Sequence, residues 1–192
     1  MKFEKSVVIS FLLLIATCSL YRIMPGRPWG FAPQIAMALF GGSVMAGRKY
    51  ALLLPLLSML ISDLLYELLY RNGLTPISGF YSGQWLNYLL FAAITFIGYA
   101  VNPRKPMHWL AGSAAAVLFY FLTSNFAVWI SGGLALNNLP YERSAAGLMQ
   151  CYIAGLPFLK MSVCSTLIFG ALFFGVYALM NSEKKIVAAT AA

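Results

Sequence analysis

Six apolar segments, each close to the length needed to cross a membrane, follow one another along the chain. They cover residues 6 to 22, 33 to 47, 51 to 70, 86 to 101, 107 to 131 and 157 to 181. A helix needs roughly 20 apolar residues to span the hydrocarbon core of a bilayer. We therefore expect an all-α polytopic membrane protein, a bundle of six transmembrane helices that forms one domain over residues 1–192.

The composition excludes a soluble domain and argues against a nucleic-acid partner. The chain is 61% hydrophobic and only 9% charged, whereas soluble domains average about 25% charged residues. The sequence has a net charge of +8 but no P-loop, no GxGxxG pattern and no basic run interleaved with aromatics. We expect the bilayer, and no nucleic acid, to be the surroundings of this chain.

The basic residues of the connections indicate an orientation. Six crossings put both termini on one side, and that side holds Lys2, Lys5, Arg48, Lys49, Arg104, Lys105, Lys184 and Lys185. The opposite side holds fewer basic residues, with Lys160 near a helix end: Arg22, Arg27, Arg71 and Arg143. Short cytoplasmic connections carry an excess of Lys and Arg, so we expect both termini in the cytoplasm.

The first segment has a second interpretation. Its charged start and apolar middle also suit a signal peptide, and IATC at residues 15 to 18 loosely resembles a lipoprotein cleavage site. A first membrane span that buries Cys18 is the simpler interpretation. The three cysteines, at positions 18, 151 and 164, are widely spaced and predict neither a disulfide framework nor a CxxC metal site.

The outer connections, at 24–33, 71–85 and 131–157, are long and rich in aromatic and amide side chains. Such a set can line a concave pocket for an organic ligand. The alternative is an interfacial aromatic belt, although three of the four tryptophans fall on the outer side. The predicted substrate-binding residues are Trp29, Phe31, Asp63, Phe80, Tyr81, Trp85, Asn87, Tyr88, Asn125, Trp129, Tyr141, Met149, Cys151 and Tyr152.

Two acidic residues lie within the third apolar segment. Asp63 and Glu67 are four positions apart and share one helix face in the outer half of the membrane. An ionised acid facing lipid near the bilayer centre costs roughly 3 kcal/mol, so both side chains require partners. We expect Glu67 to pair with Arg71. Asp63 either bonds to neighbouring helices or Lys160, or forms part of a polar pocket floor.

Small residues predict close helix packing. Ala38, Gly42 and Ala46 recur every four positions in the second segment, and Gly112 and Ala116 do so in the fifth. Stripes of this kind let membrane helices approach one another closely. We assign them a packing role and no chemistry.

No catalytic arrangement is apparent. The single histidine, His108, lies at the cytoplasmic end of the fifth segment, on the opposite side from most polar loop residues. It therefore joins neither a catalytic set nor a proton relay with Asp63, and no HExxH pattern is present. We expect a protein that is not an enzyme and holds no cofactor of its own.

Four stretches carry a family resemblance: FAPQIAMALFGG (31 to 42), PLLSMLISDLL (55 to 65), LTSNFAVW (122 to 129) and GLMQCYIAGLPF (147 to 158). With six segments and a Pro-rich first outer loop, the chain resembles the S components of energy-coupling factor vitamin transporters, most closely the solitary cobalamin-transporting type. The resemblance implies a bundle in the bacterial cytoplasmic (inner) membrane that captures a vitamin from outside under a lid of outer loops.

The first helix departs from this pattern. Many S components dock on a shared coupling protein with two ATPases through an AxxxA stripe, but this helix has Ala16 alone. The departure favours a solitary transporter over one that uses an ATPase coupling module. An S component for a different vitamin or base precursor, working with such a module, stays an alternative, as does a non-transporting assembly subunit.

A corrinoid such as cobalamin is the first substrate expectation. Its cobalt would gain from a soft axial ligand, for which Cys151 and Met149 are the outward-facing candidates. Cys151 is the metal-ligand prediction, with a buried small hydrophobe as the alternative. Without ligation a smaller molecule, such as another vitamin, a purine-like base or a queuosine-type precursor, competes with a corrinoid.

Overall fold

The computed structural model is built from helices and describes residues 5–45, 47–135 and 137–190, with side chains described within 11–180. Its elements are α1 (Lys5–Arg22), α2 (Gln34–Val44), α3 (Arg48–Arg71), α4 (Gln84–Tyr99), α5 (Pro106–Ile130) and α6 (Ala145–Thr190). In these ranges β pairing is limited to an isolated bridge between Leu134 and Pro140. The prediction of an all-α fold is confirmed.

Among the residues that the structure describes, three helices are long and apolar enough to span a bilayer: Arg48–Arg71, Pro106–Ile130 and the Ala145–Met180 part of α6. The shorter apolar helices include α2 and the Phe11–Arg22 part of α1. These lengths and compositions support a membrane protein. Six crossings and cytoplasmic termini stay a prediction.

The first five helices agree with the apolar segments to within three residues at each end, but the sixth does not. Residues 145–156, predicted to belong to the outer loop, form the first turns of α6, and Pro157 lies inside the helix. The helix begins after Ser144, whose hydroxyl accepts a hydrogen bond from the Gly147 N–H at 3.2 Å. This is the role of an N-cap residue. A membrane helix tolerates an internal proline because neighbouring groups can satisfy the freed carbonyl.

Helix α2 lies at the centre of the bundle, in contact with α3, α4, α5 and α6. Eight of its eleven residues are buried. Side chains added at Gly42 would meet the Thr95 carbonyl and Gly98, so α2 and α4 pack backbone to backbone. Ala38, on the same face, is fully buried. These contacts confirm the predicted packing role, while Ala46 lies outside the described residues.

The fifth segment packs as its small residues predict. A Cβ at Gly112 would meet Val101 and Leu39, and Ala116 is fully buried in the core. That core continues into α6, where the Trp109 ring stacks on Phe174 with 5.5 Å between ring centroids. The tight core therefore lies around α2, in the half of the bundle away from the long outer connections.

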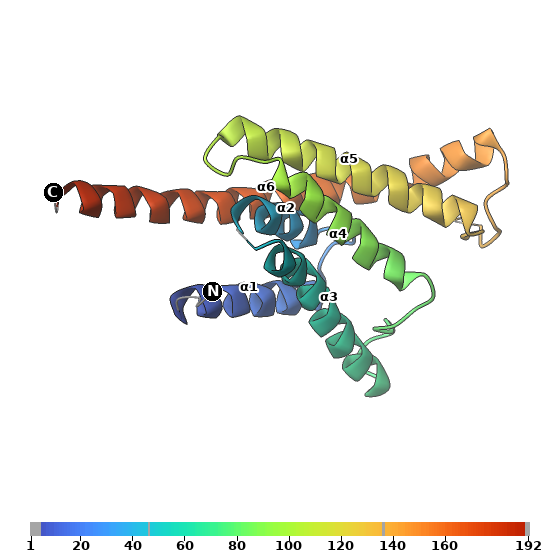
Figure 1. The fold of residues 1–192 in the computed structure, drawn as a ribbon. Coiled ribbons are helices and arrows are strands. Elements are labelled where there is room, and N and C mark those ends of the chain that lie inside the picture. The colour runs from blue at the N-terminus through green and yellow to red at the C-terminus, as the bar shows by residue number, and fades with distance from the viewer. Residues whose placement is uncertain (1–4, 46, 136, 191–192) are drawn as a thin grey trace.

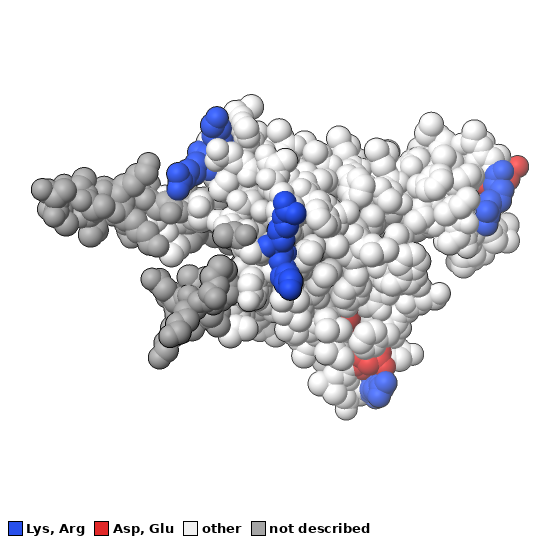
Figure 2. All heavy atoms as spheres, viewed as in Figure 1, with Lys and Arg blue, Asp and Glu red and all other residues white. Residues whose placement is uncertain are grey.

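The outer ends of the helices diverge. Figure 1 shows the end of α3 and the start of α4 pointing away from the hairpin that α5 and α6 form. On the face in Figure 2, acidic side chains appear only beside basic ones at these two diverging ends. The basic side chains at the other end of the bundle have no acidic neighbours in this view.

Candidate functional site

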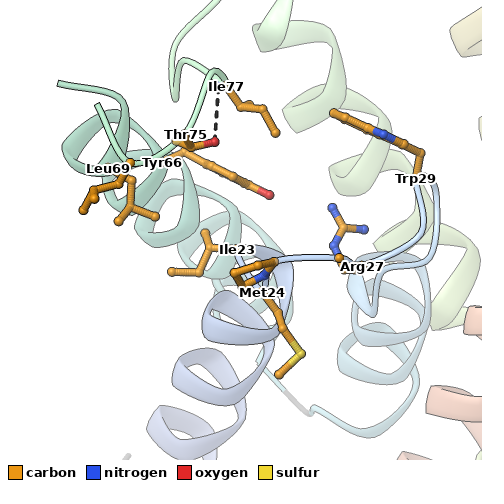
Figure 3. Close-up of a pocket in the computed structure, with 11 residues that line it drawn as sticks. Ile23, Met24, Arg27, Trp29, Tyr66, Leu69, Thr75 and Ile77 are labelled. Carbon is orange, nitrogen blue, oxygen red and sulfur yellow. Dashed lines mark hydrogen bonds between the residues drawn. The ribbon is translucent and has the colours of Figure 1, made fainter. Parts of the chain in front are cut away.

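A cavity of about 500 Å³ lies where the chain between α1 and α2 meets the outer end of α3. Its walls are Ile23, Met24, Pro25, Gly26, Arg27, Trp29, Tyr66, Leu69, Leu74, Thr75 and Ile77. Figure 3 shows that these residues come from three segments: the connection after α1, helix α3 and the connection after α3. We refer to this cavity as the outer pocket.

The connection between α1 and α2 forms one wall of the outer pocket and is stabilised by hydrogen bonds to its own backbone. The Arg27 guanidinium donates from Nε to the Arg22 carbonyl oxygen at 3.1 Å and from Nη1 to the Phe31 carbonyl oxygen at 2.7 Å. The Tyr66 hydroxyl donates to the same Arg22 carbonyl at 2.8 Å. Gly30 has a φ of +81° and a Cβ there would lie 3.0 Å from the Phe158 carbonyl oxygen, so glycine suits this turn. The segment is thereby fixed to α3 and to α6.

A buried ion pair lies beside the outer pocket. The Asp63 carboxylate, 1% exposed, accepts hydrogen bonds from the Arg22 guanidinium and the Gln84 amide. It also accepts one from the Tyr88 hydroxyl at 2.6 Å. The Arg22 guanidinium donates in addition to the Ser62 hydroxyl. These bonds join α1, α3 and α4 at one point, which we call the Asp63 network.

The Asp63 network contains the contacts that one interpretation of this residue predicted, while a ligand-binding role for Asp63 stays a prediction. Its hydrogen bonds go to neighbouring helices, as one interpretation held, and its ion-pair partner is Arg22. Within the side chains described, no ion pair joins Asp63 to Lys160. Asp63 does not line the outer pocket but supports the helix that does. Sequence reasoning predicted that Arg22 and Asp63 lie toward the same side of the membrane, but it missed this pairing.

The connection after α3 folds back onto that helix. Glu67 pairs with Arg71 at 2.8 Å between Oε1 and Nε, which confirms the predicted pair. The Ser78 hydroxyl donates to the second oxygen of Glu67 at 3.2 Å. At Gly79 a Cβ would collide with the Asp63 carbonyl oxygen, so only glycine permits this approach. The Gln84 amide donates to the Gly79 carbonyl at 3.0 Å and closes the loop.

A second set of hydrogen bonds joins α4 to α5. The Asn87 amide donates to the Tyr81 hydroxyl at 2.7 Å and accepts from the Tyr120 hydroxyl at 2.9 Å. The Tyr120 ring stacks on Phe91 with 5.3 Å between centroids. Partial burial raises the pKa of the Tyr81 phenol, the Arg22 charge lowers it by less, and the Asp63 charge raises it. Tyr81 is thus in electrostatic contact with the Asp63 network.

One comparison with known proteins identifies a family. The model of DUF6580, described as a family of unknown function, matches residues 2–189. The chain belongs to this family. No curated protein and no solved structure matches the chain.

The structure of this DUF6580 chain brings some of the predicted site residues together. One hydrogen bond joins Asp63 to Tyr88 and another joins Tyr81 to Asn87, and Trp29 lines the outer pocket. Three other predicted residues of this region, Phe31, Phe80 and Trp85, do not line the pocket. Phe31 packs against Phe169 with 6.0 Å between centroids, while Trp85 and Phe80 are 65% and 46% exposed.

A second group lies on the α5–α6 hairpin of the DUF6580 chain, away from the outer pocket. The Trp129 indole donates to the Glu142 carbonyl, the Asn125 amide to the Phe121 carbonyl, and the Tyr152 hydroxyl to the Leu122 carbonyl. Tyr141 is buried and Met149 is 60% exposed. Between this group and the outer pocket, the described side chains share no hydrogen bond or ring contact that we observe.

Cys151 belongs to this second group. Its side chain is 1% exposed and its thiol donates to the Asn125 carbonyl oxygen at 3.4 Å. Over the described residues, no three His, Cys, Asp or Glu side chains gather where they could hold a metal ion. The geometry is that of a buried small hydrophobe, and cobalt ligation by Cys151 stays an untested prediction.

Several wall residues of the outer pocket were not predicted. Arg27 was counted only as an outer cation, and Tyr66, Thr75 and Leu69 were not singled out. Tyr66 carries a usable signal, because it lies three positions after Asp63 and so shares the polar side of α3. The apolar wall residues carry no such signal, since they resemble the lipid-facing residues around them.

Proposed function

We propose that this DUF6580 protein is a membrane-embedded substrate-binding protein that takes up a vitamin-type small molecule, similar in kind to the S components of energy-coupling factor transporters. The observation that carries the proposal is the outer pocket itself, a concave space walled by two outer connections and the end of α3. A scaffold protein would need only a contact surface. A binding protein needs such a hollow.

The size and lining of the outer pocket support a small organic ligand. Its volume of about 500 Å³ falls within the roughly 300–1,000 Å³ usual for small-molecule sites. Apolar side chains such as Ile23, Leu69 and Ile77 make up most of the wall, and Arg27, Tyr66 and Thr75 supply a few polar groups. This mixture is typical of sites that bind one small molecule specifically.

The short central helix supports a cavity at membrane depth. With eleven residues, α2 is about 16 Å long, roughly half the hydrocarbon thickness. At one end or the other, chain that is not helical must therefore lie below the membrane surface. Such chain is tolerated only where protein buries it or where it lines a cavity. The connection from Ile23 to Trp29, which walls the outer pocket, meets this condition.

The topology we propose has six crossings, with both termini in the cytoplasm of a bacterial cell and the outer pocket facing outward across the inner membrane. It rests on the basic residues Arg48 and Lys49, at the start of α3, and Arg104 and Lys105, in the connection before α5. In Figure 2 the outer ends carry mixed charges. The chain contributes no ATPase motif. Transport is then facilitated, coupled to later trapping, or driven by a coupling module that docks without the usual AxxxA stripe.

Among the candidate ligands, the volume of the outer pocket favours the smaller ones. A corrinoid carries a macrocycle and a nucleotide loop, and it exceeds the drug-sized molecules that cavities of this volume enclose. Cys151, the expected cobalt ligand, lies on the α5–α6 hairpin and not in the pocket wall. Another vitamin or a base precursor is therefore our leading ligand class, with cobalamin retained as a tested alternative.

The test is direct detection of the ligand. The protein is purified in mild detergent and analysed by native mass spectrometry for a co-purifying molecule, then by thermal shift against vitamins, purine bases, cobalamin and cobinamide. Thr75→Trp fills the outer pocket, and Ser131→Trp, at the far end of α5, is the matched control. We expect a mass increment or a thermal shift that Thr75→Trp removes and Ser131→Trp keeps. A ligand retained by both variants would place the site elsewhere.

A corrinoid has its own readout in the same experiment. Bound cobalamin colours the protein, and a change in the corrin absorbance that Cys151→Ser abolishes would establish thiolate ligation. A change that survives the substitution would keep the substrate and remove Cys151 from the site. Absence of any ligand in every arm would leave the rival function, a membrane assembly subunit, as the better proposal.

A further inference from the structure

The wall of the outer pocket carries a positive charge that no carboxylate in the wall balances. Of the residues that form its wall, only Arg27 carries a charge at neutral pH, and no aspartate or glutamate is among them. The two carboxylates nearest along α3 are each engaged by another arginine: Asp63 by Arg22 and Glu67 by Arg71. In the part of the chain that the structure describes, no carboxylate pairs with Arg27.

The Arg27 guanidinium is held in place and still has donors to offer. A guanidinium has five N–H donors. Two of them hold the backbone, one from Nε to the Arg22 carbonyl and one from Nη1 to the Phe31 carbonyl. The described hydrogen bonds leave the second hydrogen of Nη1 and both hydrogens of Nη2. Charge-assisted hydrogen bonds from these donors to a carboxylate would add to the positive charge of the group.

Two aromatic side chains flank this cation. Figure 3 shows Tyr66 on one side of the outer pocket and Trp29 on the other, with Arg27 between them. Trp29 is 66% exposed, and its ring is not engaged in any described ring pair. Flat aromatic walls favour a flat ligand, which they contact by stacking or edge-to-face packing. A planar molecule with an anionic group at its rim fits both features of the wall.

We propose that the outer pocket selects planar aromatic carboxylates, with Arg27 binding the carboxylate and Trp29 packing on the ring. This inference rests on the proposed function and specifies its substrate class. A carboxylate held by a positioned arginine forms charge-assisted hydrogen bonds, whereas the matching carboxamide does not. Loss of one such interaction costs about tenfold or more in affinity.

The experiment compares acids with their amides. Purified protein is titrated with nicotinate and nicotinamide, benzoate and benzamide, and indole-3-carboxylate and its amide, and tryptophan fluorescence and thermal shift are recorded. We expect at least one acid to bind about tenfold or more tightly than its amide. Arg27→Gln abolishes the preference, and Arg71→Gln, which removes an exposed cation on α3, preserves it. Arg27 also donates hydrogen bonds to two backbone carbonyls, so its replacement changes more than the charge. Arg27→Lys keeps the positive charge and tests whether acid binding requires the planar guanidinium group.

The outcomes separate the two proposals. Equal binding of an acid and its amide, or an acid preference that survives Arg27→Gln, overturns the carboxylate assignment and leaves uptake of a small molecule intact. If phosphatidylglycerol raises the melting temperature of the protein and the carboxylates do not, Arg27 binds a lipid headgroup. The carboxylate assignment is then also overturned. If no probe binds and no molecule co-purifies, both the substrate class and the uptake function fail.

Discussion

The Arg22 guanidinium and the Asp63 carboxylate form an ion pair in which the carboxylate is 1% exposed and the arginine side chain 17%. The pair joins the end of α1 to the middle of α3, forty-one positions away. Gln84 and Tyr88 from α4 complete the shell of the carboxylate. The contact between the outer ends of these three helices is therefore stabilised by one buried carboxylate.

Removal of that charge should destabilise the protein strongly. In Asp63→Asn, Arg22 keeps its charge in a site that no longer compensates it, and breaking a buried pair in this way costs about 3–5 kcal/mol. We expect a marked fall in the melting temperature measured in detergent. The double variant Arg22→Met with Asp63→Leu should recover much of the loss, because no unpaired charge remains.

The matched control for this prediction is Glu67→Gln. It removes the other described acid of α3, whose partner Arg71 is mostly exposed. The melting temperature of this variant should stay close to that of the wild type, because exposed pairs contribute little. Equal losses in Asp63→Asn and Glu67→Gln would contradict a special role for the buried pair.

A second prediction concerns the contact between α2 and α4. In Gly42→Ala the new methyl group meets the Thr95 carbonyl and Gly98, which are backbone atoms that cannot rotate away. We expect a loss of about 1–3 kcal/mol in unfolding free energy. Gly175→Ala on α6, where no atom lies within 4 Å of the new carbon, should be neutral or slightly stabilising. Denaturant titration of both variants checks the contrast, which would be absent if α2 were loosely packed.

A third prediction follows from Tyr81. Its pKa is raised in the folded protein, chiefly by partial burial, while an unfolded tyrosine titrates near about 10. Above that pH the unfolded chain releases the phenol proton and the folded chain retains it, so stability falls as pH rises. Below it, Tyr81 contributes no pH dependence. Tyr81→Phe should flatten the fall in melting temperature at alkaline pH, and Tyr70→Phe on α3 serves as the control for loss of one phenol.

A fourth prediction tests the topology. In a variant that lacks the three native cysteines, Leu74→Cys and Asn102→Cys introduce single exposed thiols in connections on opposite sides of the proposed bundle. A maleimide that cannot cross the membrane should label the first in intact cells and the second only after lysis. The reverse pattern would place the outer pocket in the cytoplasm and contradict uptake from outside.

The sequence predicted the helices well because apolar length is a strong and local signal. The exception is α6, whose first turns carry polar and small residues together with Pro157, a combination that resembles a loop. Ser144 would have corrected this, as a capping residue directly before Ala145. The Glu67–Arg71 pair was predictable for the same reason as the helices, because its members are four residues apart on one helix.

The site was predicted less completely because its parts come from distant positions. The partner of Asp63 is forty-one residues away, and no local pattern links it to Arg22. Among the aromatic and amide residues predicted on the outer side, Trp29 lines the outer pocket and Asn87 contacts Tyr81. The same criterion also selected Trp129 and Tyr152, whose polar atoms bind backbone carbonyls of the α5–α6 hairpin. Composition cannot distinguish these two uses.

The length of α6 makes its position in the membrane depend on the thickness of the bilayer. Its apolar portion, Ala145–Met180, has 36 residues and a length of about 54 Å, far more than the roughly 30 Å of hydrocarbon. Such a helix must tilt, project beyond the lipid or thicken the membrane around it, and each response depends on acyl-chain length. The tilt of α6, or the distance by which its ends project beyond the lipid, therefore depends on the thickness of the membrane.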